Sequence, residues 1–449
     1  MKYSLQAVIL CAGRGSRFGK RGPKPVARLL GIPIVEHTIR KLSAHVEEFV
    51  LIVSRDNQRK IEGCLGDGSR IGVKIVYVIN EHPERENGYS LWLAQPYIRG
   101  RFILAMGDHY YDVKLLEKLL DGFGKPGFFV VGDPQPGGSQ VKEAEATKIF
   151  SVNNKLVDIG KNIPRWNYFD TGLFILEPTI FKTIERLGRV KQAISVSDVV
   201  LEHAKTEPFF LLSSDGHLWM DIDTLEDLRR LEEKLRSGFF KRDDGFISKK
   251  FNRKISIRVS TMFARFGVTP NQLTVLLFFF TFVPFTLFVL QKNILAGVFT
   301  QILSVLDGCD GEIARIKNIT TRSGGFLDSI LDRYGDALII LGIVVGYKTA
   351  QVSAIGLLAI AGSFLISYTN AKKEAVTGTR FRGFASQMGR DMRLFLIMLG
   401  GVTGYLVETL LLLVVLTHLV VALRIAEMVH SKGWATQAVT SLNPRANHP

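Results

Sequence analysis

Cysteine is scarce in this sequence, which also lacks an apolar leader segment and any nucleic-acid-recognition motif. The three cysteines, Cys11, Cys64 and Cys309, form no close pair, which argues against a disulfide framework and a zinc site. The N-terminus has no long apolar core of the kind found in signal peptides. The formal net charge is +15 at pH 7, but no recognition motif accompanies it, so nucleic acid is not an expected partner. Anionic lipids and phosphorylated substrates account better for the positive charge.

Hydrophobic residues are distributed unevenly along the 449 residues, and the length predicts at least two domains. We expect a cytoplasmic domain over 1–235, a linker with an interfacial helix over 236–269, a membrane domain over 270–430 and a tail over 431–449. Six segments fit membrane spans, although some are marginal in length. They are roughly 270–290, 294–314, 325–347, 351–371, 390–405 and 407–428.

The charge of the loops predicts how the membrane domain is oriented. The loops at Lys317–Arg322 and Lys372–Arg393 are much more basic than the turns at Gln291–Asn293, Tyr347–Thr349 and near Tyr405. By the positive-inside rule, the basic loops, both termini and the first domain lie in the cytoplasm. The protein is therefore expected to be a multi-pass protein of the cell membrane.

The first domain begins with a short apolar run, Gln6–Cys11, that suits a buried parallel strand. The glycine-rich loop after it would let backbone N–H groups approach phosphates, although an ordinary strand-to-helix turn looks similar. A dinucleotide site would need an acidic residue about 20 positions further on, where this chain has Ile39-Arg40-Lys41. Alternation continues with a helix around Ile34–Leu42 and strands at Phe49–Val53 and Lys74–Val78. This order predicts an α/β, Rossmann-like domain with a mostly parallel sheet.

The phrase Leu10-Cys11-Ala12-Gly13-Arg14-Gly15-Ser16-Arg17, with Pro23-Lys24-Pro25 after it, resembles the start of a sugar-phosphate nucleotidyltransferase. Such enzymes are α/β folds that join a nucleoside triphosphate to a sugar or polyol phosphate. The resemblance implies that Arg17 and Lys24 bind the triphosphate and the charge of the transition state. It also implies nucleotide contacts at Gly13, Gly15, Ser16, Asn87 and Gly88. The implied metal ligands are Asp108 and Asp223, with Asp221 a less favoured substitute, and the implied acceptor residues are Lys148, Lys161 and Asp170.

Some of these residues also fit ordinary structural roles. Glu86–Ser90 precedes a helix expected to begin near Leu91, so this segment is also a candidate helix N-cap. His109 follows Asp108 without an evident partner, which favours a structural role over a ligand role. Lysines are common on protein surfaces, so Lys148 and Lys161 are open to that interpretation too.

Two helices are expected between the domains. Leu228–Lys241 is a charged segment that we expect to close the first domain as a helix. Phe246–Phe266 has apolar residues at helical spacing with basic residues among them, the pattern of an interfacial amphipathic helix. Thr269-Pro270-Asn271 then starts the next helix, with proline at an early helical position.

Four aspartates lie within a strongly apolar part of the second domain. Asp307 and Asp310 are three residues apart, and Asp328 and Asp332 are four apart, so each pair shares one face of a helix. The polar stretch between the pairs predicts a turn, and hence a helical hairpin that aims the two pairs at each other. Convergent carboxylates need cations, and hard oxygen ligands suit Mg²⁺ or Mn²⁺. A buried ion-pair network is the alternative interpretation.

This stretch resembles the signature of the CDP-alcohol phosphotransferase family, D-x2-D-G-x2-A-R-x8-G-x3-D-x3-D, and meets every fixed position. The resemblance implies that Asp307, Asp310 and Asp328 bind metal and that Asp332 completes the site as general base. Gly311 and Ala314 would leave room for the cytidine, and Arg315 would help to hold the nucleotide. Arg390 and Arg393, with Lys372 and Lys373 as further candidates, are expected to bind an acceptor phosphate or to serve only as topology anchors.

The order of the two domains resembles the bifunctional inositol-1-phosphate cytidylyltransferases/di-myo-inositol-phosphate phosphate synthases of heat-loving microbes. The resemblance implies that the first domain makes CDP-inositol from CTP and inositol 1-phosphate. The second would transfer phosphoinositol to another inositol 1-phosphate and release CMP, in the synthesis of a compatible solute. A homodimer through the membrane domain is a further expectation. The alternatives are a lipid-synthesising phosphotransferase with a fused nucleotidyltransferase of other specificity, and a carboxylate-lined transporter with a nucleotide-binding domain.

Overall fold

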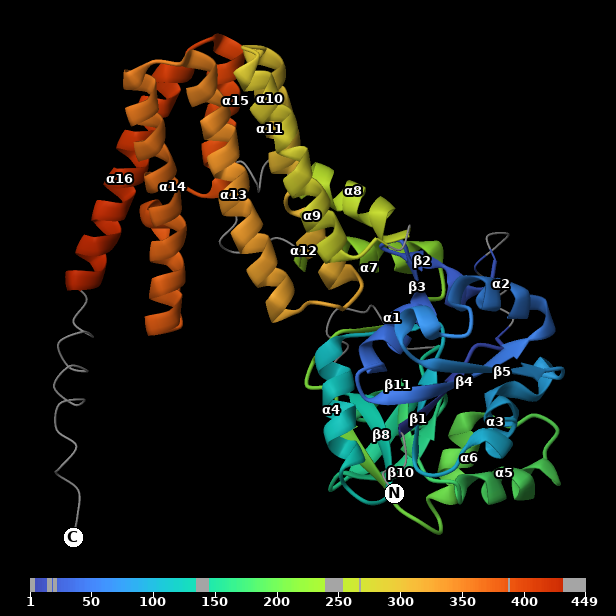
Figure 1. Cartoon of the computed structure of the whole chain (residues 1–449). Coiled ribbons are helices and arrows are strands. Elements are labelled where there is room, and N and C mark those ends of the chain that lie inside the picture. Colours follow the sequence, from blue (N-terminus) through green and yellow to red (C-terminus); the bar gives the residue numbers. More distant parts are fainter. Residues whose placement is uncertain are drawn as a thin grey trace, which may run out of the picture. The chain divides into compact units, whose positions relative to one another are not determined.

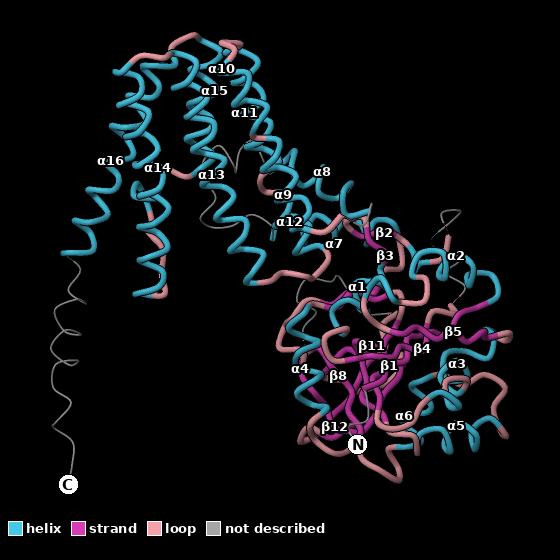
Figure 2. Tube along the Cα trace, in the orientation of Figure 1, coloured by secondary structure: helices cyan, strands magenta, loops and turns pink. Residues whose placement is uncertain are grey.

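The computed structural model describes residues 5–13, 18, 22–134, 145–238, 253–265, 268–386 and 388–430. The chain divides into two compact units, Met1–Leu235 and Arg236–Pro449. Among the described residues, every strand belongs to the first unit, and the second unit consists of helices and their connections (Figure 2).

A nine-stranded sheet in the order β5-β4-β1-β6-β11-β8-β12-β10-β9 forms the centre of the first unit (Figure 1). Its strands are β1 (Leu5–Leu10), β4 (Val46–Ser54), β5 (Lys74–Asn80), β6 (Phe102–Met106), β8 (Phe128–Asp133), β9 (Lys148–Val152), β10 (Lys155–Gly160), β11 (Tyr168–Leu176) and β12 (Phe209–Ser213). Two small ladders join β2 (Arg28–Leu29) to β3 (Ile32–Pro33) and β7 (His109–Tyr111) to β13 (Trp219–Asp221).

The prediction of a mostly parallel sheet is correct for only part of the sheet. The four strands β5, β4, β1 and β6 are parallel to one another, but β11 runs antiparallel to both β6 and β8. A β-hairpin adds further antiparallel pairing between β9 and β10. Its turn is Asn153-Asn154, with φ of 50° and 58°, and asparagine tolerates the positive φ that tight hairpins require. The Asn-Asn pair is the local sequence signal for this hairpin.

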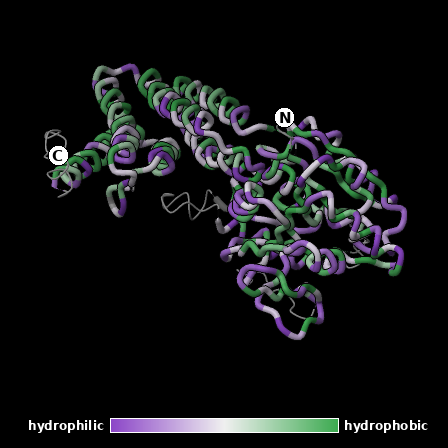
Figure 3. The backbone as a smooth tube through the Cα atoms, turned by 90° about the horizontal axis from the view of Figure 1, so that it is seen from below, coloured by the Kyte–Doolittle hydropathy of each residue, from purple (hydrophilic) through white to green (hydrophobic). Residues whose placement is uncertain are grey.

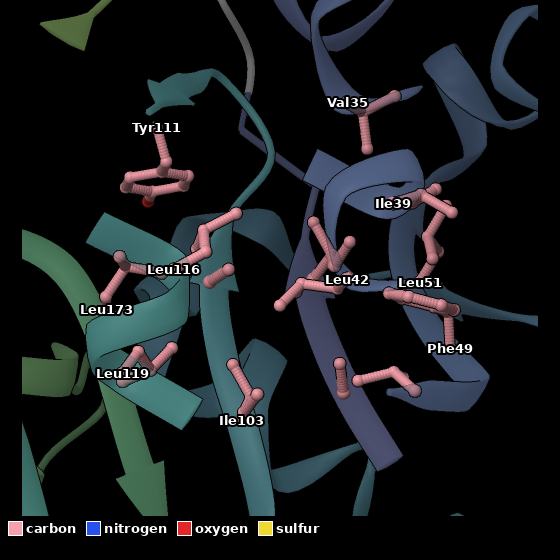
Figure 4. Packing of buried hydrophobic residues seen from close by; sticks show 14 of the residues in the cluster. Val35, Ile39, Leu42, Phe49, Leu51, Ile103, Tyr111, Leu116, Leu119 and Leu173 are labelled. Atoms are coloured by element: carbon pink, nitrogen blue, oxygen red, sulfur yellow. The ribbon is translucent and has the colours of Figure 1, made fainter. Parts of the chain in front are cut away.

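Each face of the sheet packs against its own group of helices. Ala7 and Ile9 of β1 face one core, and the intervening Val8 faces the other, as strand alternation requires. The first core includes α1 (Ile34–Leu42) and α4 (Val113–Phe123), and Figure 4 shows Ile39 and Leu42 of α1 and Leu116 of α4 within it. The other helices of this unit are α2 (Arg55–Leu65), α3 (Glu86–Trp92), α5 (Ile180–Gly188), α6 (Val196–His203) and α7 (Leu225–Gly238).

Three predicted helices differ at their boundaries. The charged helix expected from Leu228 is α7, which begins three residues earlier, at Leu225. The helix expected near Leu91 begins five residues earlier, because α3 starts at Glu86, so Asn87 and Gly88 lie in its first turn. The helix predicted to be interfacial corresponds to α8 (Arg253–Arg265), and the rest of the predicted segment lies outside the described residues. On α8 the polar Ser256 and Ser260 are buried whereas Ile255 and Met262 are about half exposed. An outward apolar face of this kind suits a helix at a membrane surface.

The second unit contains four helices or helix pairs that are long and apolar enough to cross a membrane, among its described residues. They are Pro270–Val289, Asn293–Ile316, Ala350–Thr377 and Leu406–His430, and hydrophobic residues dominate much of their length (Figure 3). The first comprises α9 (Pro270–Phe280) and α10 (Phe282–Val289), the second α11 (Asn293–Leu306) and α12 (Cys309–Ile316), and the others α14 (Ala350–Thr377) and α16 (Leu406–His430). The first helix pair breaks near Thr281, where Pro284 removes a backbone donor.

The predicted number of six spans is not confirmed. α13 (Arg322–Tyr347) is 26 residues long but carries Asp328, Asp332, Arg333 and Asp336, which lower its hydropathy. α15 (Arg390–Thr403) has only 14 residues. Helices α13 and α10 pack closely at a glycine. An added Cβ on Gly342 of α13 would lie 2.8 Å from the carbonyl oxygen of Phe285 in α10. Small residues allow such close approach of helices in membranes.

Candidate active sites

A cavity of about 690 Å³ opens beyond the carboxyl ends of β1 and β6 in the first unit. Ligands commonly bind at the carboxyl ends of parallel strands in α/β folds. The cavity is lined by five of the residues that the sequence predicted for this site: Gly13, Lys24, Asn87, Asp108 and Lys161. Gly15, Ser16 and Arg17 lie outside the described residues.

Lys24 joins two acidic segments that are distant in sequence. Its Nζ contacts Oδ1 of Asp223 and lies 3.6 Å from Oδ2 of Asp108. The lysine stands in a 3₁₀ turn, Lys24–Val26, between Pro23 and Pro25, which restrict its backbone. Burial alone would lower the pKa of Lys24, but the carboxylates of Asp108, Asp223 and Asp221 outweigh it and raise that pKa. An ammonium group that is charged at neutral pH is therefore held in the cavity wall.

The β7–β13 ladder brings a third acid to this site. Asp221 pairs with His109 in the ladder, and one ligand atom each from Asp108, His109 and Asp221 lie within 4.8 Å of one another. His109 Nδ1 lies 2.9 Å from Oδ1 of Asp108 and 3.6 Å from Asp221. Although burial opposes it, the nearby carboxylates raise the pKa of His109 to about 9. Carboxylate oxygens of this group fit Mg²⁺, and the structure gives the imidazole the carboxylate partners that the sequence did not reveal.

Asn87 and Gly88 occupy different positions relative to the cavity. Asn87 lines it, and the Oδ1 atom of this residue accepts a 2.7 Å hydrogen bond from the backbone of Val196. Gly88 donates its backbone N–H to the carbonyl of Ile194, and an added Cβ would lie 2.6 Å from that same oxygen. Close packing against Ile194 therefore leaves no room for a side chain at this position.

The three predicted acceptor residues of the first unit are not equivalent. Lys161 is exposed and lines the cavity. The ammonium group of Lys148 lies over the ring of Trp166, 5.5 Å from its centroid. Asp170 accepts a 2.9 Å hydrogen bond from the backbone of Gly172, and burial raises the pKa of Asp170 to about 6. Lys161 is the one of these three that the cavity wall includes.

The predicted helical hairpin is present in the second unit. Asp307 follows α11, Asp310 lies in the first turn of α12, and Asp328 and Asp332 lie in α13 after a polar turn. The hydroxyl of Thr321 caps α13 by accepting a 3.0 Å bond from the backbone of Gly324. A Cβ on Gly324 would lie 2.9 Å from that hydroxyl and from Oδ1 of Asn271. Gly324 of the signature therefore leaves space for the side chains of Thr321 and Asn271 at the start of α13.

Three of the four signature aspartates converge directly. One carboxylate oxygen each from Asp307, Asp328 and Asp332 lie within 4.8 Å of one another. Asp310 lines the same pocket, of about 20 Å³, and accepts a 2.5 Å hydrogen bond from the hydroxyl of Thr274. A set of carboxylate oxygens at this separation fits Mg²⁺ or Mn²⁺ as ligands.

The side chain of Arg390 enters this carboxylate cluster. Its Nη1 atom contacts Asp307 and lies 2.6 Å from Oδ1 of Asp332. Arg393, predicted with it, is buried and bonds instead to Asp336 and to the carbonyl of Met388, at 2.7 and 2.9 Å. Of the two arginines, Arg390 is the one that lines the acidic pocket.

Gly311 and Ala314, the two signature residues predicted to leave room for the cytidine, both have close neighbours. An added Cβ on Gly311 would have the guanidinium of Arg315 as its nearest neighbour, at 3.5 Å, and Ala314 is buried. Lys373, the further acceptor candidate, bonds to Glu427 at 2.6 Å and lies over the ring of Phe381. Lys372 is exposed.

Two buried acids near the signature were missed by sequence reasoning. Glu312 lies inside the signature and accepts 2.7 Å hydrogen bonds from both Ser256 and Ser260 of α8. Asp336 follows Asp332 by four residues and is bonded to Arg390 and Arg393. The repeated four-residue spacing of Asp328, Asp332 and Asp336 was the available signal for the second.

Comparisons with known families divide the chain into two parts, as the structure does. Residues 7–183 match the family model described as MobA-like NTP transferase domain, and residues 267–439 match CDP-alcohol phosphatidyltransferase. The fold and the two sites thus define a nucleotidyltransferase fused to a CDP-alcohol phosphotransferase membrane domain.

Similar proteins span both domains. A bifunctional IPC transferase and DIPP synthase of Archaeoglobus fulgidus is 40% identical over 403 residues, covering 88% of this chain and 78% of the relative. One from Aquifex aeolicus is 33% identical, covering 95% and 99%. The chain belongs to the family of bifunctional IPC transferases and DIPP synthases. A solved structure of the inositol-1-phosphate CTP transferase from T. maritima aligns with 53% of this chain and 99% of its own, at 26% identity and a TM-score of 0.45.

Proposed function

We propose that this enzyme makes CDP-inositol from CTP and inositol 1-phosphate, then transfers phosphoinositol to a second inositol 1-phosphate and releases CMP. The observation that supports this best is one chain with both sites, in a family named for two linked activities. The product would be a phosphorylated di-inositol phosphate, the precursor of a compatible solute.

In the first reaction, a phosphate oxygen of inositol 1-phosphate attacks the α-phosphorus of CTP, and pyrophosphate leaves. The backbone around Gly13 binds the triphosphate together with Arg17, and Lys24 offsets the negative charge that develops on it. Lys161, in the cavity wall, is our candidate for the acceptor phosphate. Asp108 is the central metal ligand, with Asp223 or Asp221 as its partner.

In the second reaction, a hydroxyl of inositol 1-phosphate attacks the β-phosphorus of CDP-inositol. Asp332 accepts the proton from this hydroxyl, and the bond to CMP breaks. Asp307, Asp310, Asp328 and Asp332 would hold divalent cations, which offset the charge of the diphosphate. Gly311 and Ala314 leave room for the cytidine, Arg315 helps to hold the nucleotide, and Arg390 binds a substrate phosphate.

A radiolabelled CTP assay tests this scheme on the full-length chain without added lipid. We expect labelled CDP-inositol and then CMP when inositol 1-phosphate is the only alcohol supplied. A chain that releases CMP only after a lipid acceptor is added would be a phospholipid-synthesising enzyme. Substitution of other phosphoalcohols for inositol 1-phosphate gives the specificity of both steps.

We also propose that the two active sites face the cytoplasm, with α13 and α15 completing six spans. The apolar second half of α13, after Asp336, and the length of this helix support the proposal. Lys348 lies in the turn before α14 and Lys372 lies near the C-terminal end of that helix, and both are exposed. In a chain with Cys64 replaced by serine, a cysteine at Lys348 should react with an impermeant reagent from outside, and one at Lys372 should not. The reverse pattern would contradict the orientation.

A further inference from the structure

Asp336 is a buried acid that neither the metal cluster nor the signature explains. It lies one helical turn beyond Asp332 on α13 and is 3% exposed. Residues four apart share a helix face, so Asp336 lies on the same side of α13 as Asp328 and Asp332. It belongs to no carboxylate group that could hold a metal among the described residues.

The two carboxylate oxygens of Asp336 bind different arginines of α15. Oδ1 accepts from Nε of Arg390 at 2.8 Å, and Oδ2 accepts from Nη2 of Arg393 at 2.7 Å. Oδ2 also lies 3.3 Å from the hydroxyl of Ser363 and 3.5 Å from Nη1 of Arg333. A buried carboxylate needs such compensation, and arginine gives it with fixed geometry.

These bonds fix the direction of the Arg390 guanidinium. A guanidinium is planar, so holding its Nε on one side determines where both Nη atoms point. Nη1 is thereby directed at Asp307 and Asp332, two acids of the transfer site. The neighbouring residue on α13 is Gly335, whose added Cβ would lie 3.4 Å from Nη2 of Arg390. The helix therefore provides both an anchor and space for this side chain.

The charges near Asp336 favour an anion as the partner of Arg390. Three guanidinium groups, those of Arg333, Arg390 and Arg393, surround this single carboxylate. The other acids that face Arg390 are those we propose as cation ligands, so their negative charge serves the metal. Once bound cations neutralise those acids, including Asp332, which also lies 3.8 Å from Arg333, the three guanidinium groups outnumber the charge of Asp336. A phosphate group of a substrate would then supply the counter-charge.

We propose that Asp336 is a positioning residue, which holds Arg390 so that its guanidinium binds a phosphate group of a substrate beside Asp307 and Asp332. The phosphate belongs either to inositol 1-phosphate or to the diphosphate of CDP-inositol. This inference rests on the proposed second reaction, and it assigns to Asp336 a role that acts through Arg390.

The test uses the full-length chain in lipid nanodiscs supplied with CDP-inositol and inositol 1-phosphate. Asp336→Asn keeps the shape of the side chain but removes its charge. Arg390→Lys keeps a positive charge but lacks the planar guanidinium group. Each variant and the double variant are compared by kcat, by KM for each substrate and by protection from heat unfolding by inositol 1-phosphate. The control is Ser367→Ala, since Ser367 lies one turn from Ser363 and, among the described residues, its hydroxyl bonds within its own helix, at 3.4 Å.

We expect Asp336→Asn to raise the KM of one substrate by about tenfold or more, as is typical when an orienting partner is lost. A change in the KM of inositol 1-phosphate, with loss of its protective effect, assigns the phosphate to the acceptor. A change in the KM of CDP-inositol assigns it to the donor. In the Arg390→Lys background, Asp336→Asn should add less than about twofold, because the two residues act as one unit.

Two results would overturn the inference. One is a fall in kcat with both KM values unchanged. The other is a double variant whose change in KM equals the product of the changes in the two single variants. Asp336 would then act independently of Arg390, as a purely structural residue. A wild-type chain that releases no CMP from CDP-inositol would contradict the proposed function itself, so the two failures are distinguishable.

Discussion

The two active sites place a basic side chain between two carboxylates, but they do so in very different surroundings. In the first unit, Lys24 contacts Asp223 and approaches Asp108 in the wall of a cavity of about 690 Å³. In the second, Arg390 contacts Asp307 and Asp332 in a pocket of about 20 Å³. A lysine is a flexible point charge, whereas arginine is a planar fork that keeps its charge when buried. The open site of the first unit uses lysine, and the narrow site of the second unit uses arginine.

The largest expected effect separates the two sites at Asp332. Asp332→Asn keeps the size of the side chain but cannot accept a proton, so transfer from CDP-inositol should fall by about 10²–10⁴-fold. Synthesis of CDP-inositol should change by less than about twofold, because the first site lies in a different compact unit and shares no predicted residue with the second. Chromatography of a reaction fed with CTP should show CDP-inositol accumulating. CMP release near the wild-type rate would show that Asp332 is not the base.

The reciprocal change is Lys24→Ala in the first unit. Loss of its charge should slow CDP-inositol synthesis by about 10²–10³-fold, the usual effect of losing one group that stabilises a transition state. Transfer from supplied CDP-inositol should be unaffected, as measured by CMP release. A variant that loses both reactions would mean that the two sites depend on each other.

A smaller effect tests the close packing that supports the second site. Gly342→Ala places a Cβ 2.8 Å from the backbone of α10, and it should destabilise the membrane unit by about 1–3 kcal/mol. Thermal unfolding in detergent gives the change. Gly325→Ala is the matched control on the same helix, because no atom lies within 4 Å of its added Cβ. Equal destabilisation by both variants would show that backbone freedom, and not packing, is what matters.

The smallest effect concerns the contact between α8 and the signature helix. Ser260→Ala removes a 2.7 Å hydrogen bond to buried Glu312, which should cost about 1–2 kcal/mol. Thr261→Val is the control on the same helix, since the Thr261 hydroxyl bonds to the carbonyl of Ile257 within α8. Thermal unfolding should shift further for the first variant, and CDP-inositol synthesis should stay unchanged in both. No difference between them would mean that Glu312 does not need this hydroxyl.

Local spacing explains which parts of the fold and sites were predictable. Asp307, Asp310, Asp328 and Asp332 lie at helical intervals on either side of a polar turn, so the hairpin and its acids follow from nearby residues. Asp307 and Arg390 are 83 positions apart, and no periodicity links them. The sequence identified Arg390 and Arg393 as cations that could bind a phosphate. The role of Arg393 beside Asp336 depends on how α13, α14 and α15 pack, which the sequence does not reveal.

The first domain shows the same limit. The apolar run of β1 and the loop after it predicted a parallel strand and a phosphate-binding turn. The antiparallel β11 was missed because a strand's own sequence does not reveal its direction in the sheet. Likewise, Asp221 and Asp223 lie two positions apart, and the β7–β13 register decides that Asp221 approaches His109 while Asp223 contacts Lys24.

The hydrogen bonds between α8 and Glu312 have a consequence for how the coding sequence can be divided. Because Ser256 and Ser260 contact the signature helix, α8 belongs to the transferase and not to the connection that precedes it. A gene split between codons 238 and 253 would separate none of the described helices and strands from its own unit, as α7 is described to Gly238 and α8 from Arg253. A split after α8 would instead separate Glu312 from both serines. Two separate genes should therefore replace this one only when the junction lies before α8.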